Sequence, residues 1–154
     1  MTRCLVAQSA TEIEAVRRLF EEYWNSFGFA PCFQNFAAEL ATLPGDYAPP
    51  GGVLALATVA GEPAGCAALR RIDETRCEAK RLYVRPAFRG AGIGRALLDW
   101  VIAEARNAGY REMFGDTMPV MDRALAIYER YGFERCPPYS AAPTPGAIYL
   151  RLKL

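Results

Sequence analysis

Hydrophobic positions recur with two periods along this chain, and the change between them predicts where helices and strands lie. Ser9 followed by Glu12 is a capping-box pattern, and it predicts a helix that runs to about Trp24. A second helical stretch covers 33–43 and ends at Pro44-Gly45. The apolar stripe of the first helix consists of Ile13, Val16, Leu19, Phe20 and Tyr23.

Short apolar runs bounded by glycine and proline predict the strands. The Gly61-Glu62 pair predicts a tight hairpin turn. Two further helices are expected, one that follows the glycines after residue 89 and ends at Gly109, and one over 119–130. The passage from 76 to 117 reads as strand, helix, strand, which makes its two strands parallel. The fold class is therefore α/β, with a mixed central sheet of six to seven strands flanked by helices. The strand segments are 3–8, 53–60, 63–72, 76–84, 112–117, 134–137 and 147–152.

Length and charge narrow the range of functions. With 154 residues, the chain is expected to form one domain over 1–154 that buries a core without crosslinks. Eighteen basic and 17 acidic residues give a formal charge of +1, so no overall field favours nucleic acid or an acidic membrane. The chain has no histidine, which excludes Ser-His-Asp catalysis, imidazole bases and histidine-containing zinc sites.

Cysteine usage and hydropathy indicate the compartment. The five cysteines are widely spaced without a Cys-x-x-Cys pair, so we expect reduced, mostly buried thiols and no metal. The apolar run at the N-terminus is too short for a signal peptide, and nowhere do 18 apolar residues follow one another. The expected location is the cytoplasm.

The most informative segment joins the strand over 76–84 to the following helix. Three glycines within five residues let a ligand approach the backbone, and the free N–H groups of a helix start favour phosphate. A Walker loop would require Lys-Ser/Thr after Gly94, where Arg95-Ala96 stands, and a dinucleotide fingerprint would require glycine at 95. The segment reads Arg89-Gly90-Ala91-Gly92-Ile93-Gly94-Arg95.

This segment resembles the R/Q-x-x-G-x-G/A signature of the GNAT acetyltransferase superfamily, and the blocks at 78–84 and 124–133 extend the resemblance in the family's order. The resemblance implies that residues 89–95 hold the pyrophosphate of acetyl-coenzyme A, a co-substrate used without a metal. It also implies that the fourth and fifth strands splay around the cofactor, whose amide-bearing arm bonds to backbone groups of Leu82, Tyr83 and Val84.

The resemblance suggests two catalytic residues. Tyr128 stands where the family's phenol donates to the departing sulfur, although an aromatic residue at helical spacing also suits a core. Glu78 stands where several members carry the base for the amine; the alternative is a solvated carboxylate paired with Lys80 or Arg81. The family's asparagine, seven residues before the tyrosine, is here Met121.

The resulting hypothesis is an N-acetyltransferase that acts by direct attack in a ternary complex. Its acceptor is a small-molecule or peptide amine, expected between the aromatic- and proline-rich segments 26–52 and 136–146, although these residues could equally only pack two loops. The alternative is a non-catalytic acyl-coenzyme A-binding sensor or interaction module. The sequence leaves both a monomer and a homodimer open.

Overall fold

A seven-stranded mixed sheet forms the centre of the molecule in the computed structural model, which describes residues 1–30, 33–140 and 143–154. The strand order is β1-β2-β3-β4-β5-β7-β6, and only β4 and β5 pair in parallel among the described strands. This confirms the predicted mixed sheet and crossover. The strands are β1 (Thr2–Val6), β2 (Val53–Val59), β3 (Glu62–Arg71), β4 (Arg76–Val84), β5 (Glu112–Thr117), β6 (Glu134–Arg135) and β7 (Ile148–Lys153).

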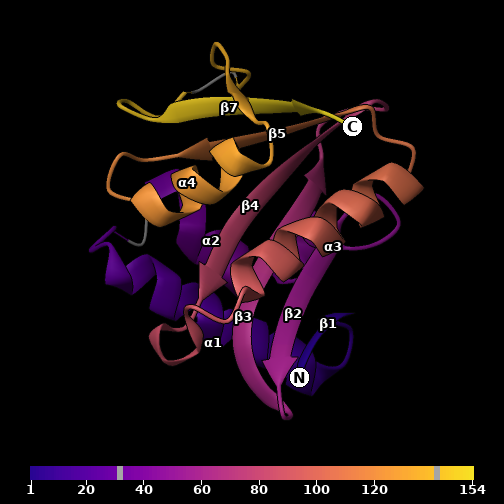
Figure 1. The fold of residues 1–154 in the computed structure, drawn as a ribbon, viewed down its shortest axis with the longest axis vertical. Helices are drawn as coiled ribbons and strands as arrows, with labels where there is room; N and C mark the ends of the chain where they lie inside the picture. The colour runs from indigo at the N-terminus through magenta and orange to yellow at the C-terminus, as the bar shows by residue number, and fades with distance from the viewer. Residues whose placement is uncertain (31–32, 141–142) are drawn as a thin grey trace.

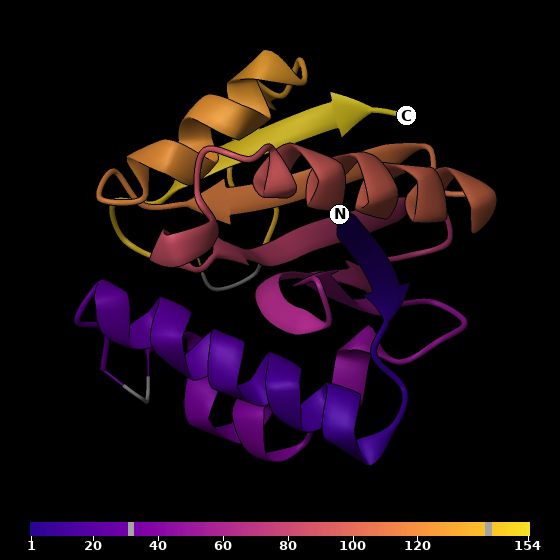
Figure 2. The same ribbon diagram turned by 60° about the horizontal axis from the view of Figure 1, so that its bottom comes forward.

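Helices cover both faces of this sheet. Figures 1 and 2 show α1 and α2 on one side and α3 and α4 on the other. The apolar stripe of α1 packs into the core on its side, and the buried face of α3 packs into the core on the other. None of the described helices is long and apolar enough to cross a membrane. The helices are α1 (Ala10–Ser26), α2 (Phe36–Ala41), α3 (Ile93–Asn107) and α4 (Asp122–Arg130), with short 3-10 turns at Phe33–Asn35, Gly45–Tyr47 and Pro86–Phe88.

Local signals in the sequence set several boundaries correctly. The Ser9 hydroxyl accepts from the Glu12 N–H while the Glu12 carboxylate accepts from the Ser9 N–H, so the capping box is confirmed. Gly109 follows α3 with a φ of +89°, as expected of the residue after a helix end.

Two local expectations were wrong. The β2–β3 hairpin turns at Ala60-Gly61 rather than Gly61-Glu62, because Val59 pairs with Glu62 and both turn residues have positive φ. The helix expected over 33–43 shortens to α2, because Gln34 and Asn35 adopt left-handed backbone conformations that a continuous helix cannot contain.

The β4 strand contains a bulge that turns an arginine into the core. Cys66 pairs with Tyr83 and Ala68 pairs with Lys80, so β4 carries one residue more than β3 between these pairs. Arg81 lies in this bulge with a φ of +61°. Its guanidinium is buried against the rings of Trp24 and Phe36, 4.9 Å and 5.5 Å from their centroids.

The parallel pair β4–β5 separates after a few residues. Its register contains Arg76 with Glu112, Cys77 with Met113 and Glu78 with Phe114, and no pair follows among the described residues. The second half of β4 therefore has a free edge toward β5, as the ribbon of Figure 1 shows. This divergence confirms the predicted splay and creates the space for a site.

Candidate active site

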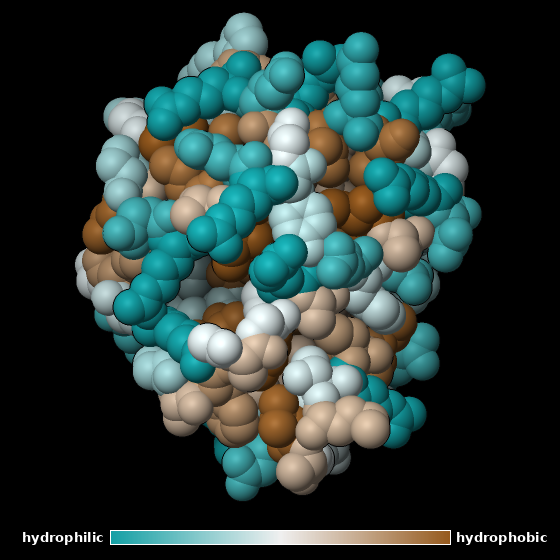
Figure 3. All heavy atoms as spheres, viewed as in Figure 1, coloured by the Kyte–Doolittle hydropathy of each residue, from teal (hydrophilic) through white to brown (hydrophobic). Residues whose placement is uncertain are grey.

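A cleft of about 540 Å³ opens where β4 and β5 diverge. Its size is typical of ligand sites. The space-filling view shows a hollow on this face, surrounded by long hydrophilic side chains (Figure 3). The lining residues come from α1, β4, the loop before α3, the first turn of α3, and α4: Tyr23, Ser26, Phe27, Leu82, Tyr83, Val84, Phe88, Arg89, Gly90, Gly92, Ile93, Gly94, Arg95, Met121, Asp122, Arg123, Ala124, Ile127 and Arg130.

The glycine loop forms one wall of this cleft. Gly90 and Gly92 have φ values of +86° and +78°, and a Cβ built on either would meet no atom within 4 Å. Their backbone is therefore open to a ligand, as a phosphate cradle requires. Gly94 has a different role, because a Cβ there would lie 3.0 Å from Ile127 Cδ1, so its lack of a side chain lets α3 pack against α4. Ala91 is exposed in the turn and does not line the cleft.

The unpaired half of β4 forms the floor. Leu82, Tyr83 and Val84 all line the cleft, and their edge toward β5 makes no strand pairing. The Arg89 side chain lies across this edge, because its Nε donates to the Val84 carbonyl oxygen at 3.1 Å. A free strand edge can bond an amide-bearing chain as an additional strand would.

Tyr128 is buried under the wall that α4 contributes. It is 3% exposed, and its ring packs edge-on against Phe133 at 5.1 Å. Among the described residues, its hydroxyl has no hydrogen-bond partner. Burial raises the pKa of this hydroxyl well above its ordinary value, and the charges of Asp116 and Glu78 raise it further.

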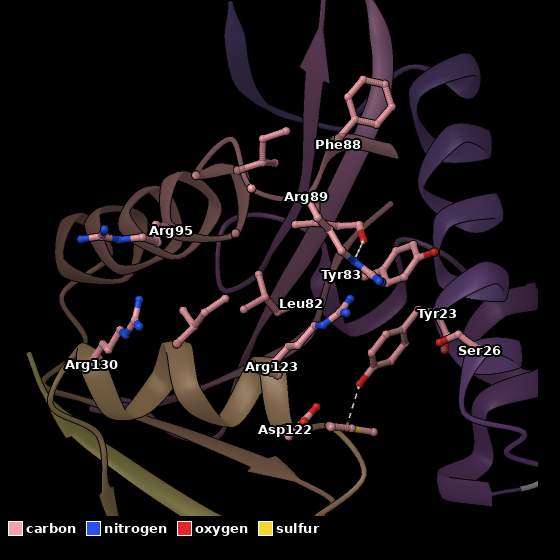
Figure 4. A pocket seen from close by; sticks show the side chains of 18 of the residues that line it. Tyr23, Ser26, Leu82, Tyr83, Phe88, Arg89, Arg95, Asp122, Arg123 and Arg130 are labelled. Carbon is pink, nitrogen blue, oxygen red and sulfur yellow. Dashed lines mark hydrogen bonds between the residues drawn. The ribbon is translucent and has the colours of Figure 1, made fainter. Parts of the chain in front are cut away.

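Met121, in place of the family's asparagine, has its own polar contact. The Tyr23 hydroxyl, from α1, donates to the Met121 sulfur at 3.3 Å, as Figure 4 shows. Burial raises the pKa of Tyr23 to about 12, so its hydroxyl stays protonated in the neutral range. Tyr23 and Met121 both line the cleft.

Glu78 is buried, which excludes the solvated carboxylate that we considered. It is 3% exposed, and it accepts from Arg70 Nε and from the Tyr139 hydroxyl, each at 2.5 Å. Its partners are therefore not Lys80 or Arg81. The contact to Tyr139 ties the 136–146 segment to β4.

A second, much smaller cavity of about 20 Å³ lies where β5 ends. This space is enough for about one water molecule. Thr117 lines it with a buried hydroxyl that has no hydrogen-bond partner among the described residues. Asp116 also lines it and accepts from Gln34 Nε2 at 3.2 Å. Tyr23 and Met121 line both this cavity and the cleft, so the two spaces adjoin.

Sequence reasoning missed several of these residues. Arg123 and Arg130 were not selected, although they lie seven residues apart with Ile127 between them, a spacing that marks one helix face. Asp116 and Thr117 gave no local signal, because only the splay of β4 and β5 brings them to the site. In the segment 26–52, which was expected on the acceptor side, Glu39 is paired with Arg81 and Asp46 is exposed.

Comparison with known proteins agrees with this geometry. The model of the acetyltransferase (GNAT) family matches residues 13–133. The chain belongs to the GNAT acetyltransferase family. An uncharacterized N-acetyltransferase of Schizosaccharomyces pombe is 34% identical over 93% of this chain and 89% of its own. This GNAT chain is therefore an acyltransferase.

Solved GNAT structures show the same fold. A GNAT family acetyltransferase of Staphylococcus aureus superposes with a TM-score of 0.85 over 99% of each chain, at 18% identity. A GNAT family acetyltransferase of Elizabethkingia anophelis, solved with acetyl-coenzyme A bound, superposes with a TM-score of 0.66 over 100% of this chain and 97% of its own, at 22% identity.

The residues of this GNAT chain fit such a ligand. The open backbone at Gly90 and Gly92 is a cradle that a Cβ would fill, and four arginines line the same cleft.

The described cysteines are free thiols, and of these only Cys66 and Cys77 are buried, whereas Cys4 and Cys136 are partly exposed. Cys32 lies outside the described residues. Among the residues that the structure covers, no three His, Cys, Asp or Glu side chains gather as a metal site would require.

Proposed function

We propose that this protein transfers the acetyl group of acetyl-coenzyme A directly to an amine within a ternary complex. The observation that carries this proposal is the splay of β4 and β5. The open glycine loop and the free edge of β4 line one cleft there, and the buried Tyr128 belongs to α4, which lines the same cleft with other residues. Acetyl-coenzyme A supplies an acetyl group activated as a thioester. The remaining steps belong to side chains and backbone groups of this chain.

Different residues are proposed to bind different parts of acetyl-coenzyme A. The N–H groups of Gly90–Gly94, with Arg89 and Arg95, face the pyrophosphate at the start of α3. The free edge of Leu82, Tyr83 and Val84 bonds the amide-bearing arm, and an N–H at Tyr83 or Val84 polarises the reacting carbonyl. Ala91 shapes the turn, and the side chain of Ile93 packs under it.

Two groups handle protons in this proposal. Glu78 takes a proton from the attacking amine, directly or through water, and the Tyr128 hydroxyl donates to the sulfur as it leaves. The raised pKa of Tyr128 keeps the donor protonated throughout the neutral range. The two charges cancel when the proton on Glu78 returns to Tyr128 through solvent.

The amine is proposed to enter through the small cavity at the end of β5. The Thr117 hydroxyl is the unpaired acceptor there, and the Asp116 carboxylate attracts a cationic amine before it loses its proton. Gln34, which bonds to Asp116 and to the Thr144 hydroxyl, would have to move to admit an acceptor. An amine on a small organic body or a peptide end suits this entrance.

The cofactor site is tested by Gly92→Ala. We expect at least a tenfold loss of affinity for acetyl-coenzyme A in calorimetry, because the methyl group stands where the phosphate approaches. Gly109→Ala is the matched control, since Gly109 has a similar positive φ and equally open space at the other end of α3. Both variants carry the same backbone strain, so equal affinities in the two would refute the phosphate site.

The role of Glu78 is tested by Glu78→Gln. If Glu78 is the base, turnover falls most at neutral pH and recovers as alkaline pH deprotonates the amine in solution. Tyr139→Phe is the control, because it removes one hydrogen bond to Glu78 and keeps the carboxylate. A ratio of variant to wild-type rates that stays flat from neutral to alkaline pH would assign Glu78 to anchoring the 136–146 segment instead.

Thiol release from acetyl-coenzyme A across a panel of amines tests the proposed activity itself. A catalyst releases thiol faster with at least one amine than without any. Tight binding in calorimetry without amine-dependent release would instead support a sensor or interaction module.

A further inference from the structure

Four arginines line the cleft without an acidic partner. Arg89, Arg95, Arg123 and Arg130 form no ion pair with a described residue, whereas Asp122 is the one acidic side chain among the described lining residues. The chain as a whole carries only +1. The positive charge is therefore concentrated at this cleft, which favours a polyanion.

A pyrophosphate alone does not account for this charge. The open N–H groups of the glycine loop and Arg89 already serve a diphosphate at the start of α3. Coenzyme A carries a second anionic group, a phosphomonoester on the 3′-oxygen of its ribose. Such a group has a charge of about −1.5 to −2 at neutral pH, and the planar fork of arginine matches its oxygens.

Contacts between α3 and α4 bring two of these arginines together. The Tyr131 hydroxyl lies 3.0 Å from the Arg95 carbonyl oxygen and 2.6 Å from Asp99 Oδ1. Tyr131 directly follows Arg130, so this contact holds the end of α4 on the first turn of α3. In Figure 4, Arg95 and Arg130 lie at one end of the cleft, while Tyr23 and Ser26 lie at the other.

Arg123 lies elsewhere along the same face of α4. Seven residues separate it from Arg130, which corresponds to two helical turns and about 10 Å along the axis. Figure 4 places Arg123 nearer to Leu82 and Tyr83, the edge proposed for the amide-bearing arm. The nucleotide end of the ligand therefore belongs at the opposite end, where Arg130 is.

We infer that Arg130, next to the Arg95 that faces the pyrophosphate, binds the 3′-phosphate of coenzyme A and makes this protein select coenzyme A over dephospho-coenzyme A. The inference rests on the proposed function, because it assigns a subsite to the same cofactor. Arg95 and Arg130 are both exposed, and neither forms an ion pair with a residue that the structure describes. The 3′-phosphate thus pairs with α4, while the pyrophosphate pairs with the glycine loop.

Calorimetric titration of the full chain with coenzyme A and with dephospho-coenzyme A tests this assignment. We expect the wild type to bind coenzyme A on the order of tenfold more tightly. Arg130→Gln should weaken coenzyme A binding by about that factor, leave dephospho-coenzyme A within about twofold, and so abolish the discrimination. Arg130→Lys should retain part of it, and Arg106→Gln, an exposed change at the far end of α3, should retain all of it.

The outcomes separate this inference from the proposed function. If the wild type binds both ligands equally, or if Arg130→Gln weakens both equally, the 3′-phosphate assignment is overturned while the cofactor site stands. If the wild type binds neither ligand, the proposed function itself fails. A thermal melt of each variant confirms that it is folded before titration.

Discussion

Tyr128→Phe is expected to lower kcat by about tenfold to a thousandfold while the affinity for acetyl-coenzyme A changes little. The substitution removes only a hydroxyl, and the proposed hydrogen bond to the departing sulfur forms in the transition state. Folding should be nearly unaffected, because that hydroxyl has no partner among the described residues and the ring keeps its packing against Phe133. Steady-state kinetics, calorimetry and thermal melting measure the three quantities.

Tyr131→Phe is the matched control for this experiment. Tyr131 is a neighbouring aromatic residue at the end of the same helix, and its hydroxyl bonds to Asp99 and the Arg95 carbonyl. We expect it to retain kcat and, at most, to weaken cofactor binding. An unchanged kcat in Tyr128→Phe would end the general-acid proposal and leave water as the proton donor.

Glu39→Gln is expected to destabilise the fold by about 3 kcal/mol at neutral pH, because it leaves the Arg81 guanidinium buried without a counter-charge. Arg81 Nε and Nη2 donate to the two Glu39 oxygens at 2.9 Å and 2.8 Å, and the Arg81 side chain is 4% exposed. A loss of this size lowers the Tm of a domain of this length by about 10 °C. Chemical denaturation and thermal melting measure it.

The same pair predicts a pH dependence. Burial alone would raise the pKa of Glu39, but the hydrogen bond and charge of Arg81 outweigh it and hold the pKa below its ordinary value. A lowered pKa in the folded state gives stability above the unfolded-state pKa, about 4.3, and this stability disappears as the pH falls through the folded-state pKa. The difference in folding stability between wild type and Glu39→Gln should therefore be largest at neutral pH and become smaller in acid.

Two further variants make this prediction specific. Glu14→Gln removes a half-exposed carboxylate that pairs with Arg17 on α1, and it should cost well under 1 kcal/mol. The double variant Glu39→Leu with Arg81→Met should be milder than Glu39→Gln, because it removes both charges rather than stranding one. Equal melting temperatures for Glu39→Gln and Glu14→Gln would contradict a stabilising buried pair.

Local sequence signals predicted the elements that carry the cofactor cleft. The capping box at Ser9, the glycine after α3 and the strand–glycine loop–helix passage each depend on residues within a few positions of one another. The crossover that they imply allows only a parallel pair for β4 and β5. The resemblance of the blocks around this loop then indicated the family, which the family model confirms.

The hydrogen-bond and ion-pair partners of the charged side chains could not be predicted from the sequence. The partner of Glu78 was expected two or three residues away, but Arg70 comes from the neighbouring strand and Tyr139 is 61 residues away. Arg81 and Glu39 are 42 residues apart, and nothing near either one marks the bulge that buries the arginine. Likewise, Gly94 was assigned to the phosphate, whereas its contact with Ile127 shows that it also spaces two helices.

The sequence alone therefore determined the order of the elements, the glycine loop and the parallel crossover, because turns, caps and short-range periodicity act within a few residues. The tertiary structure decided which charges are paired and which remain free to bind a ligand. Arg81 is neutralised by Glu39, whereas Arg95 and Arg130 line the cleft and form no ion pair with a described residue. That difference depends on packing between segments distant in the chain, where burial makes an unpaired charge too costly to keep and exposure at a cleft leaves it available.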